Sequence, residues 1–179
     1  SSAASDVYKR QVKLRNAGKV SSKCLDYVTD KIKPGISTQE IDEMCVDFLH
    51  KHNAYSAPLF YRGFPKSICT SVNHVVCHGI PCDKTLNNGD IINVDVTSLV
   101  DGFHGDTSRT FCVGKVSVKA KNLVEATREA LDRSIKILKP GINLGDIGNE
   151  IQTYVEKKGY SVVKAVSYTH LRAHETSYD

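Results

Sequence analysis

The sequence has no long apolar segment. No stretch approaches the roughly 20 consecutive apolar residues that a membrane-spanning helix requires, and the N-terminus lacks the apolar core of a secretory signal peptide. A long basic run is also missing, and a net charge of +4 over 179 residues gives little support for nucleic-acid recognition. We therefore expect a cytoplasmic protein that binds neither membranes nor nucleic acids.

Closely spaced cysteine pairs are missing as well. None of the six cysteines belongs to a C-x-x-C pair, so we expect free thiols in a reducing compartment rather than disulfides or a zinc site. Cys77 and Cys82 flank His78, which leaves a thiol role near a site open. The chain is 40% hydrophobic and 25% charged, which is typical of one globular domain with a sizeable core.

Both termini resemble translated sequencing-adapter sequence. Residues 1–11, SSAASDVYKRQ, and the later segment VSYTHLRAHET back-translate readily to the two adapters of a transposase-based library. We therefore expect residues 1–11 and 166–179 to be artefactual tails, and residues 12–165 to be the native domain. On this interpretation His170, His174 and Glu175 are not candidate ligands.

A helical pattern occurs twice. Apolar residues recur at three- and four-residue steps from Leu14 to Ile32 and predict an amphipathic helix, and a capping box formed by Ser37 and Glu40 begins a second helix, at about 38–51. The segment KPGISTQEIDEMCVDFLHKHN at 33–53 returns as KPGINLGDIGNEIQTYVEKKG at 139–159, offset by 106 positions. A further amphipathic helix, from Leu123 to Leu138, precedes the second copy. The repeat indicates two related halves, of which only the first is followed by a long strand-rich segment.

The segment GDIINVDVTSLVDGFHGDTSRTFC at 89–112 predicts a β-hairpin. Alternation from Ile91 to Thr97 is typical of a half-buried strand, a second strand is expected from Phe103 to Val113, and Asp101-Gly102 suits a two-residue turn. If Val100 pairs with Phe103, Asp106 lies opposite Thr97 and diagonal to Asp95, roughly 7–8 Å away at the backbone. Two facing carboxylates repel unless one is protonated or a cation lies between them. The pattern therefore favours a divalent-metal site, although single aspartates that cap a turn or face water remain open.

Between the first repeat and the hairpin, Pro58, Gly63 and Pro65 indicate a loop with exposed aromatic residues. Short strands are expected at 67–72 and 75–78, and Gly79-Ile80-Pro81 predicts a turn. His78, at the end of the second short strand, is either a surface histidine or a polar residue of a site.

Several spaced motifs resemble the short bacterial type of methionine aminopeptidase. These are PKSICTSVN at 65–73, VVCHGIP at 75–81, GDIINVDVT at 89–97, DGFHGDTSRTF at 101–111 and both KPGI helices. The resemblance implies an α+β, pita-bread fold, in which two pseudo-symmetric halves each pack helices on a curved antiparallel sheet. The second half would be truncated in this chain.

The resemblance also implies a site with two divalent metal ions (Co, Mn, Fe or Zn). Asp95 and Asp106 match two of five metal ligands, and Asp106 matches the one that bridges both metals. His78 matches a catalytic histidine that binds the substrate, Tyr61, Phe64 and Cys69 match the walls of the methionine pocket, and Thr97 matches a residue beside the ligands. The other three ligands, a histidine and two glutamates, would follow the segment GYSVV at 159–163.

The implied activity is removal of the N-terminal methionine from nascent polypeptides near the ribosome, by a monomeric enzyme. With three ligands missing, we expect this polypeptide as written to be inactive. An Xaa-Pro aminopeptidase on the same scaffold would normally carry a large N-terminal domain, and the HGIP and DGFHGDTS contexts favour the methionine enzyme. A non-catalytic binding module on the same fold is the second alternative, although such a module has no need of two facing carboxylates.

Overall fold

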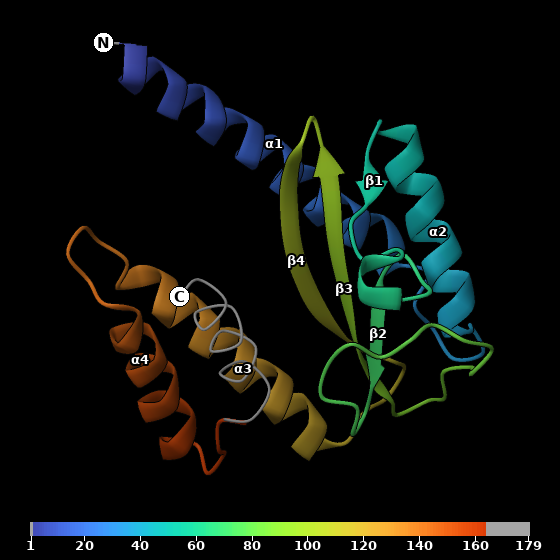
Figure 1. Cartoon of the computed structure of the whole chain (residues 1–179). Coiled ribbons are helices and arrows are strands. Elements are labelled where there is room, and N and C mark those ends of the chain that lie inside the picture. The colour runs from blue at the N-terminus through green and yellow to red at the C-terminus, as the bar shows by residue number, and fades with distance from the viewer. Residues whose placement is uncertain (1, 164–179) are drawn as a thin grey trace. The chain divides into compact units, whose positions relative to one another are not determined.

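The computed structural model describes residues 2–163, and the chain divides between Ser117 and Val118 into two compact units. The first unit contains the helices α1 (Ser2–Thr29) and α2 (Thr38–Lys51), the strands β1 (Tyr55–Ser56), β2 (Cys69–Val72), β3 (Ile91–Val100) and β4 (Phe103–Cys112), and the 3-10 helix η1 (Tyr61–Gly63) (Figure 1). The second unit contains α3 (Val118–Lys136) and α4 (Leu144–Lys157). None of the described helices is long and apolar enough to cross a membrane.

β3 is the central strand of an antiparallel sheet. It pairs with β4 along its whole length, from Ile91↔Cys112 to Val100↔Phe103. β1 pairs with β3 at Leu99 and Ser98, and β2 pairs with it from Asp95 to Ile92, so both occupy the edge that β4 leaves free (Figure 1). The predicted hairpin and its register are confirmed.

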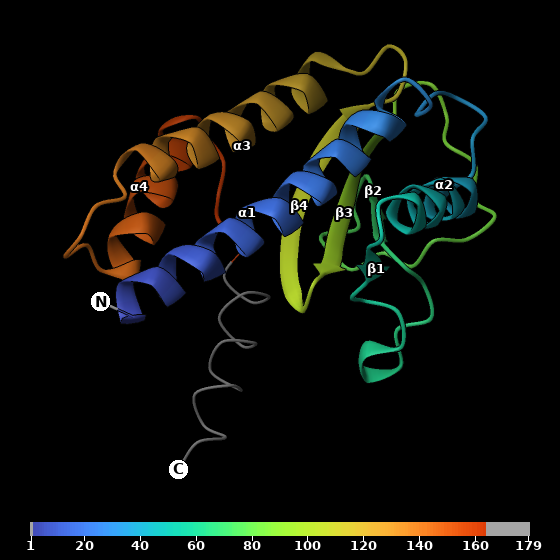
Figure 2. The ribbon, with the colours of Figure 1, turned by 90° about the horizontal axis from the view of Figure 1, so that it is seen from above.

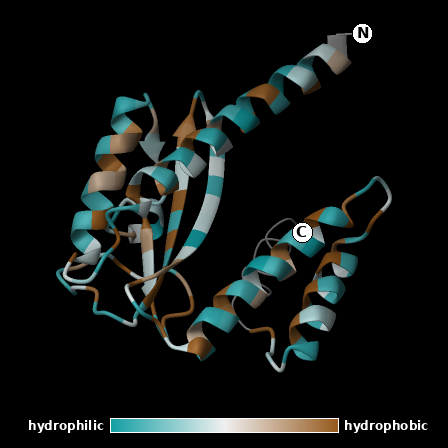
Figure 3. Ribbon diagram, turned by 180° about the vertical axis from the view of Figure 1, so that it is seen from behind, coloured by the Kyte–Doolittle hydropathy of each residue, from teal (hydrophilic) through white to brown (hydrophobic). Residues whose placement is uncertain are grey.

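Alternation along β3 assigns one face of the sheet to the core. Every second residue of β3 is buried, beginning with Ile92, and the intervening residues are half-buried. Figure 3 shows bands of polar and apolar residues along the strands. α1 crosses the buried face (Figure 2), and the middle of the predicted stripe on this helix is buried, as Ala17, Val20, Cys24, Leu25 and Val28. Leu14 at its start is 50% exposed, and Ile32 follows the end of the helix at Thr29. The opposite face, which carries Asn93, Asp95 and Thr97, is thereby left available for a site.

A buried polar seam holds α1 close to the hairpin. The Ser21 Oγ donates to the Gly105 carbonyl oxygen at 2.6 Å, and the Ser98 Oγ donates to the Ala17 carbonyl oxygen at 3.1 Å. The backbones approach so closely that a Cβ on Gly105 would lie 2.2 Å from the Ala17 carbonyl carbon. The absence of a side chain at position 105 therefore permits this packing.

The repeated segments form equivalent structures. α2 and α4 begin and end at positions offset by 106 residues, and Gly35 and Gly141 precede them with φ values of 94° and 89°. At the start of α2, the Glu40 N–H donates to Ser37 Oγ at 3.1 Å and the Ser37 N–H donates to Glu40 Oε2 at 2.7 Å. The predicted capping box is therefore confirmed.

Four sequence-based expectations differ from the structure. No strand forms at 75–78, where the Val75 N–H closes a turn on the Val72 carbonyl at 3.1 Å, and β2 begins two residues later than expected. α1 begins at Ser2, within the segment 1–11 that the sequence predicts to be a tail outside the native domain. The larger apolar residues of α3, including Leu131 and Ile135, are exposed, because within the described residues α3 packs through the small residues Ala126, Ala130 and Ser134.

Candidate metal centre

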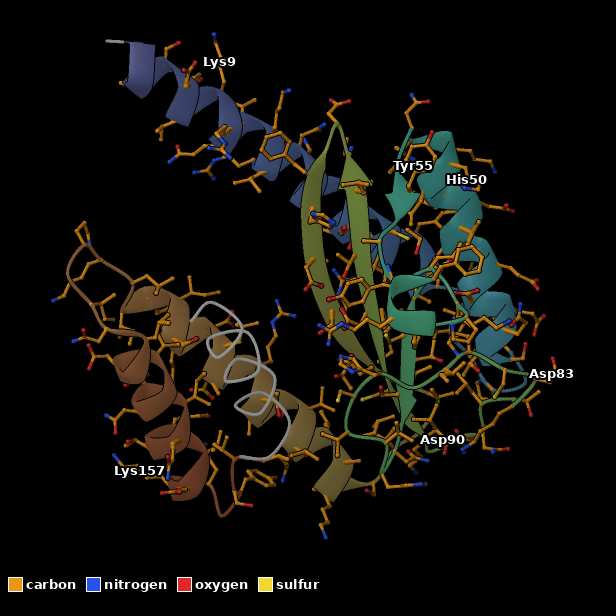
Figure 4. The ribbon with its side chains drawn as sticks, viewed as in Figure 1. Lys9, His50, Tyr55, Asp83, Asp90 and Lys157 are labelled. Atoms are coloured by element: carbon orange, nitrogen blue, oxygen red, sulfur yellow. The ribbon has the colours of Figure 1, made fainter. Side chains whose placement is uncertain are left out.

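The turn of the hairpin determines which side chains meet on the open face. Asp101 and Gly102 have φ values of 50° and 80°, as a two-residue turn between antiparallel strands requires. Thr97 therefore lies opposite Asp106, and Ser108 lies opposite Asp95. Tyr55, paired with Leu99 near the turn, and Asp90, just before the first residue of β3, lie near the two ends of this strand (Figure 4).

Asp95 and Asp106 form a facing pair of carboxyl groups. The pKa of Asp95 is raised to about 6: burial is the largest cause, the charge of Asp106 and a hydrogen bond shared with Asp106 add to it, and His78 opposes it. The Thr97 hydroxyl donates to Asp106 Oδ1 at 3.0 Å. Below about pH 6 a proton on Asp95 relieves the repulsion between the two carboxyl groups.

Cys69 flanks this pair on the other side of β3. Its Cα lies opposite that of Asp95 in the β2–β3 ladder, and its side chain is buried. Burial raises the pKa of the Cys69 thiol to about 11, and the charges of Asp95, Cys77 and Asp106 contribute. The thiol is therefore neutral at pH 7 and forms an uncharged wall beside the carboxylates.

His78 reaches the site from a strained turn. Its φ is 54°, a conformation that costs energy for a residue with a Cβ. The following residue is anchored to β2, because the Thr70 N–H donates to the Gly79 carbonyl at 2.8 Å and the Gly79 N–H donates to Ser71 Oγ at 3.2 Å. The exposed imidazole is close enough for its charge to lower the pKa of Asp95. The structure thus brings His78 to the carboxylate pair, from a turn rather than from the strand that the sequence predicted.

Tyr61 and Phe64 belong to the loop at 57–66. The loop contains η1, which lies on the opposite side of the sheet from α1 (Figures 1 and 2), and the Phe60 N–H closes it by donating to the Phe64 carbonyl at 2.8 Å. Tyr61 is 56% exposed and Phe64 is half-buried. The loop therefore places both aromatic residues on the side of the sheet that carries the two aspartates.

Two carboxylates with oxygen donors fit a hard divalent cation. The described residues contain no group of three or more His, Cys, Asp and Glu side chains suited to hold a metal ion. Asp95 and Asp106 therefore fit part of a metal site, and His170, His174 and Glu175 lie outside the described residues.

One buried acidic residue was missed by sequence reasoning. Asp42 on α2 is 5% exposed, and its Oδ1 accepts the Ser67 and Ile68 N–H groups at 2.9 Å each. Its position next to Ile41 and three residues before Cys45, on the predicted buried face of the helix, is a signal that could have drawn attention to it.

Comparisons with known proteins identify the family to which this fold belongs. A sequence model of metallopeptidase family M24 matches residues 12–177, and the chain belongs to this family. The expected pita-bread fold class is confirmed.

The chain is similar to methionine aminopeptidases within this family. It is 54% identical over 153 residues to the methionine aminopeptidase of Rickettsia prowazekii, covering 86% of this chain and 59% of that relative. The crystal structure of the Rickettsia prowazekii enzyme matches with a TM-score of 0.87 and 52% identity, over 88% of this chain and 64% of the other. An Xaa-Pro dipeptidase from Bacillus anthracis shares the fold, with a TM-score of 0.73 and 24% identity over 83% of this chain and 40% of the other. The chain thus spans about three fifths of its methionine aminopeptidase relative.

Proposed function

We propose that residues 12–165 are part of a methionine aminopeptidase, which hydrolyses the first peptide bond of a polypeptide that begins with methionine. The observation that carries this proposal is the placement of Asp95 and Asp106 on one sheet face beside Cys69 and His78. The identity of 54% with a methionine aminopeptidase supports this substrate over an Xaa-Pro peptide.

Asp95 and Asp106 would contribute carboxylate ligands to two divalent ions. Such ions, when bound, supply an activated water and polarise the scissile carbonyl. The Thr97 hydroxyl orients the Asp106 carboxylate through its hydrogen bond. His78 would donate a hydrogen bond to the substrate near the scissile peptide, and the neutral Cys69 thiol with Tyr61 and Phe64 would enclose the methionine side chain.

The partners of the complete enzyme would be the N-termini of nascent polypeptides near the ribosome in the cytoplasm. The complete enzyme would act as a monomer.

The present polypeptide is proposed to be inactive, because it supplies two carboxylates and the other three ligands would follow residue 165. Two ligands bind a divalent ion weakly, since the coordination energy is small and the repulsion is only partly relieved. Addition of Mn²⁺ or Co²⁺ to this chain is expected to release no methionine from a Met-Ala-Ser peptide above the level of an Asp106→Asn sample. Release that depends on Asp106 would contradict the inactivity of the fragment.

Metal binding tests the site independently of turnover. Titration calorimetry with Mn²⁺ is expected to show weak binding to the wild-type chain and at least a tenfold loss, roughly, in Asp106→Asn, since one of two ligands is weakened. Asp83→Asn is a matched control, because Asp83 lies in the loop between β2 and β3 (Figure 4). Equal Mn²⁺ affinity in the wild type and in Asp106→Asn would contradict the metal centre and favour a non-catalytic binding module.

The origin of the termini is tested on the source DNA. A specific primer is extended across the codon for Ala165. The sequence read beyond this codon is expected to encode a β-strand with a histidine, followed by two glutamates. A native reading frame that encodes VSYTHLRAHETSYD and then stops would contradict the proposed tail at 166–179.

A further inference from the structure

We propose that Asp42 is a positioning residue for the methionine pocket, and that it acts by clamping the neck of the loop at 57–66. The assignment of Cys69, Tyr61 and Phe64 to a methionine pocket rests on the proposed function. The hydrogen bonds of Asp42 do not, because they lie within the first unit. Asp42 touches neither of the aspartates that would hold metal; its effect passes through the backbone of Ser67 and Ile68.

The clamp consists of one carboxylate oxygen and two successive backbone N–H groups. Asp42 Oδ1 accepts both N–H groups at 2.9 Å, and the side chain is buried. No lysine, arginine or histidine of the described residues forms an ion pair with Asp42. Lys66, whose charge acts on Asp42, donates instead to Gln39 Oε1. A carboxylate buried without a partner cation is costly, and the two N–H bonds are its principal compensation.

The same two residues form the end of the loop. The Ser56 Oγ donates to the Ser67 carbonyl at 2.5 Å, and the Ala57 N–H donates to the Thr97 carbonyl at 3.0 Å. Ser67 is therefore held on both sides, its N–H by Asp42 and its carbonyl by Ser56. The two ends of the loop are fixed to each other, to α2 and to β3.

The clamp lies next to the site along the chain. Cys69, the first residue of β2, follows Ile68 directly and pairs with Asp95. Tyr61 and Phe64 lie within the clamped loop, so all three wall residues depend on the position of its neck. Asp95 and Asp106 belong to the hairpin, which is held by its own ladder and by the Ser21–Ser98 seam. Loss of Asp42 should therefore disturb the pocket and leave the hairpin intact.

Three variants of the whole chain distinguish a local effect of Asp42 on the loop from a general loss of stability. Asp42→Ala removes the acceptor, whereas Asp42→Asn retains an Oδ1 that accepts both N–H groups without the buried charge. Asp47→Ala removes an exposed acidic residue of the same helix and is the matched control.

Alkylation resolved by mass spectrometry provides the first readout. Cys69 should react about 10–100 times faster in Asp42→Ala, as expected for the loss of hydrogen bonds to a charged group, while Asp42→Asn and Asp47→Ala react like the wild type. The core thiol Cys24, fully buried on α1, reports global opening and should keep its wild-type rate. Unchanged reactivity of Cys69 in Asp42→Ala, or equal acceleration at Cys24, would overturn the clamp, as would failure of Asp42→Asn to restore protection.

Ligand binding provides the second readout. In the presence of Mn²⁺, Asp42→Ala should weaken the binding of free L-methionine about tenfold or more and leave the affinity for Mn²⁺ within about twofold of the wild-type value. Parallel loss of both affinities would contradict a role confined to the pocket. If the wild-type chain binds no L-methionine, the proposed function fails at this site, while the alkylation result still decides whether Asp42 clamps the loop.

Discussion

At the scale of single residues, the facing aspartates make the stability of the metal-free protein depend on pH in the direction opposite to that of most carboxyl groups. The pKa of Asp95 is raised to about 6 from 3.8, chiefly by burial and then by Asp106. Between these two values the native state binds more protons than the unfolded state, so the contribution of Asp95 to the free energy of unfolding decreases as the pH rises. The contribution is favourable at low pH and is lost as the pH passes through about 6.

Asp95→Asn tests this dependence because it removes the titrating group and retains the shape. The measurement is urea unfolding of both proteins at pH 4.5 and at pH 7, in the presence of a metal chelator. The free energy of unfolding of the variant, relative to that of the wild type, should be higher at pH 7 than at pH 4.5. Comparison with the wild type at each pH cancels the opposite contributions of Glu40 and Asp90, whose pKa values are lowered by hydrogen bonds. A difference in unfolding free energy that does not change with pH would contradict the raised pKa of Asp95.

Gly105 provides a second prediction at this scale. A Cβ at position 105 would lie 2.2 Å from the Ala17 carbonyl carbon and 2.3 Å from its oxygen, so Gly105→Ala must separate α1 from the hairpin. We expect a loss of about 3 kcal/mol or more in the free energy of unfolding. Gly18→Ala, on the facing helix and with no heavy atom within 4 Å of the new Cβ, should instead be neutral or stabilise by up to about 1 kcal/mol. Equal effects of the two changes in thermal unfolding would argue against the close approach.

At the scale of elements, the two copies of the repeated segment differ in how well they are capped. Ser37 is buried and its hydroxyl accepts from the Glu40 N–H at 3.1 Å. At the equivalent position of the second copy, Asn143 is exposed and its N–H donates to Asp146 Oδ2 at 3.0 Å. The hydroxyl of Ser37 is therefore an acceptor in a less solvated environment, where a hydrogen bond stabilises the helix more strongly.

Ser37→Ala should lower the free energy of unfolding by about 1 kcal/mol, because one N–H group at the start of α2 loses its acceptor. The measurement is urea unfolding followed by circular dichroism. Ser22→Ala, at an exposed position of α1, should change the value by less than about 0.5 kcal/mol. Equal free energies of unfolding for the two variants would show that the capping box of Ser37 and Glu40 does not stabilise α2.

At the scale of the whole molecule, apolar residues of the second unit remain uncovered by the described residues. Leu131 and Ile135 on α3 are 54% and 55% exposed, and Leu138 and Leu144 are also exposed. Figure 3 shows apolar positions in brown on both α3 and α4, and the buried core of these described helices is small, consisting of Ala126, Ala130, Tyr154 and Val155. Such groups favour association when they form a contiguous patch.

We therefore expect the chain to self-associate as its concentration rises, and the double variant Leu131→Lys/Ile135→Lys to reduce this association. Sedimentation velocity measures the change, and the free energy of unfolding should stay within about 1 kcal/mol of the wild type, as for other exposed positions. Arg128→Lys/Asp132→Glu, which alters an exposed ion pair of the same helix, is the control for the surface change. A large loss of stability in the double lysine variant would show that other parts of the chain cover these leucine and isoleucine side chains.

Features encoded by short-range patterns were predicted from the sequence. The hairpin register, the facing of Asp95 and Asp106, the stripe on α1 and the capping box at Ser37 each depend on residues close together in the chain or on a regular period. The family also follows from contiguous motifs. These patterns determine local geometry directly, because backbone preferences and side-chain periodicity act over a few residues.

Other features were decided by the tertiary structure. The clamp from Asp42 to Ser67 and Ile68, the contact of Gly105 with Ala17, and the turn that brings His78 to the carboxylates join residues that are far apart in sequence or in separate elements. A strand at 75–78 was wrongly predicted because its apolar residues suit a strand, whereas the anchoring of Gly79 to β2 imposes a turn. Such contacts form only when the sheet and helices pack together, so no local pattern specifies them, and the packing decides which polar groups are buried and paired.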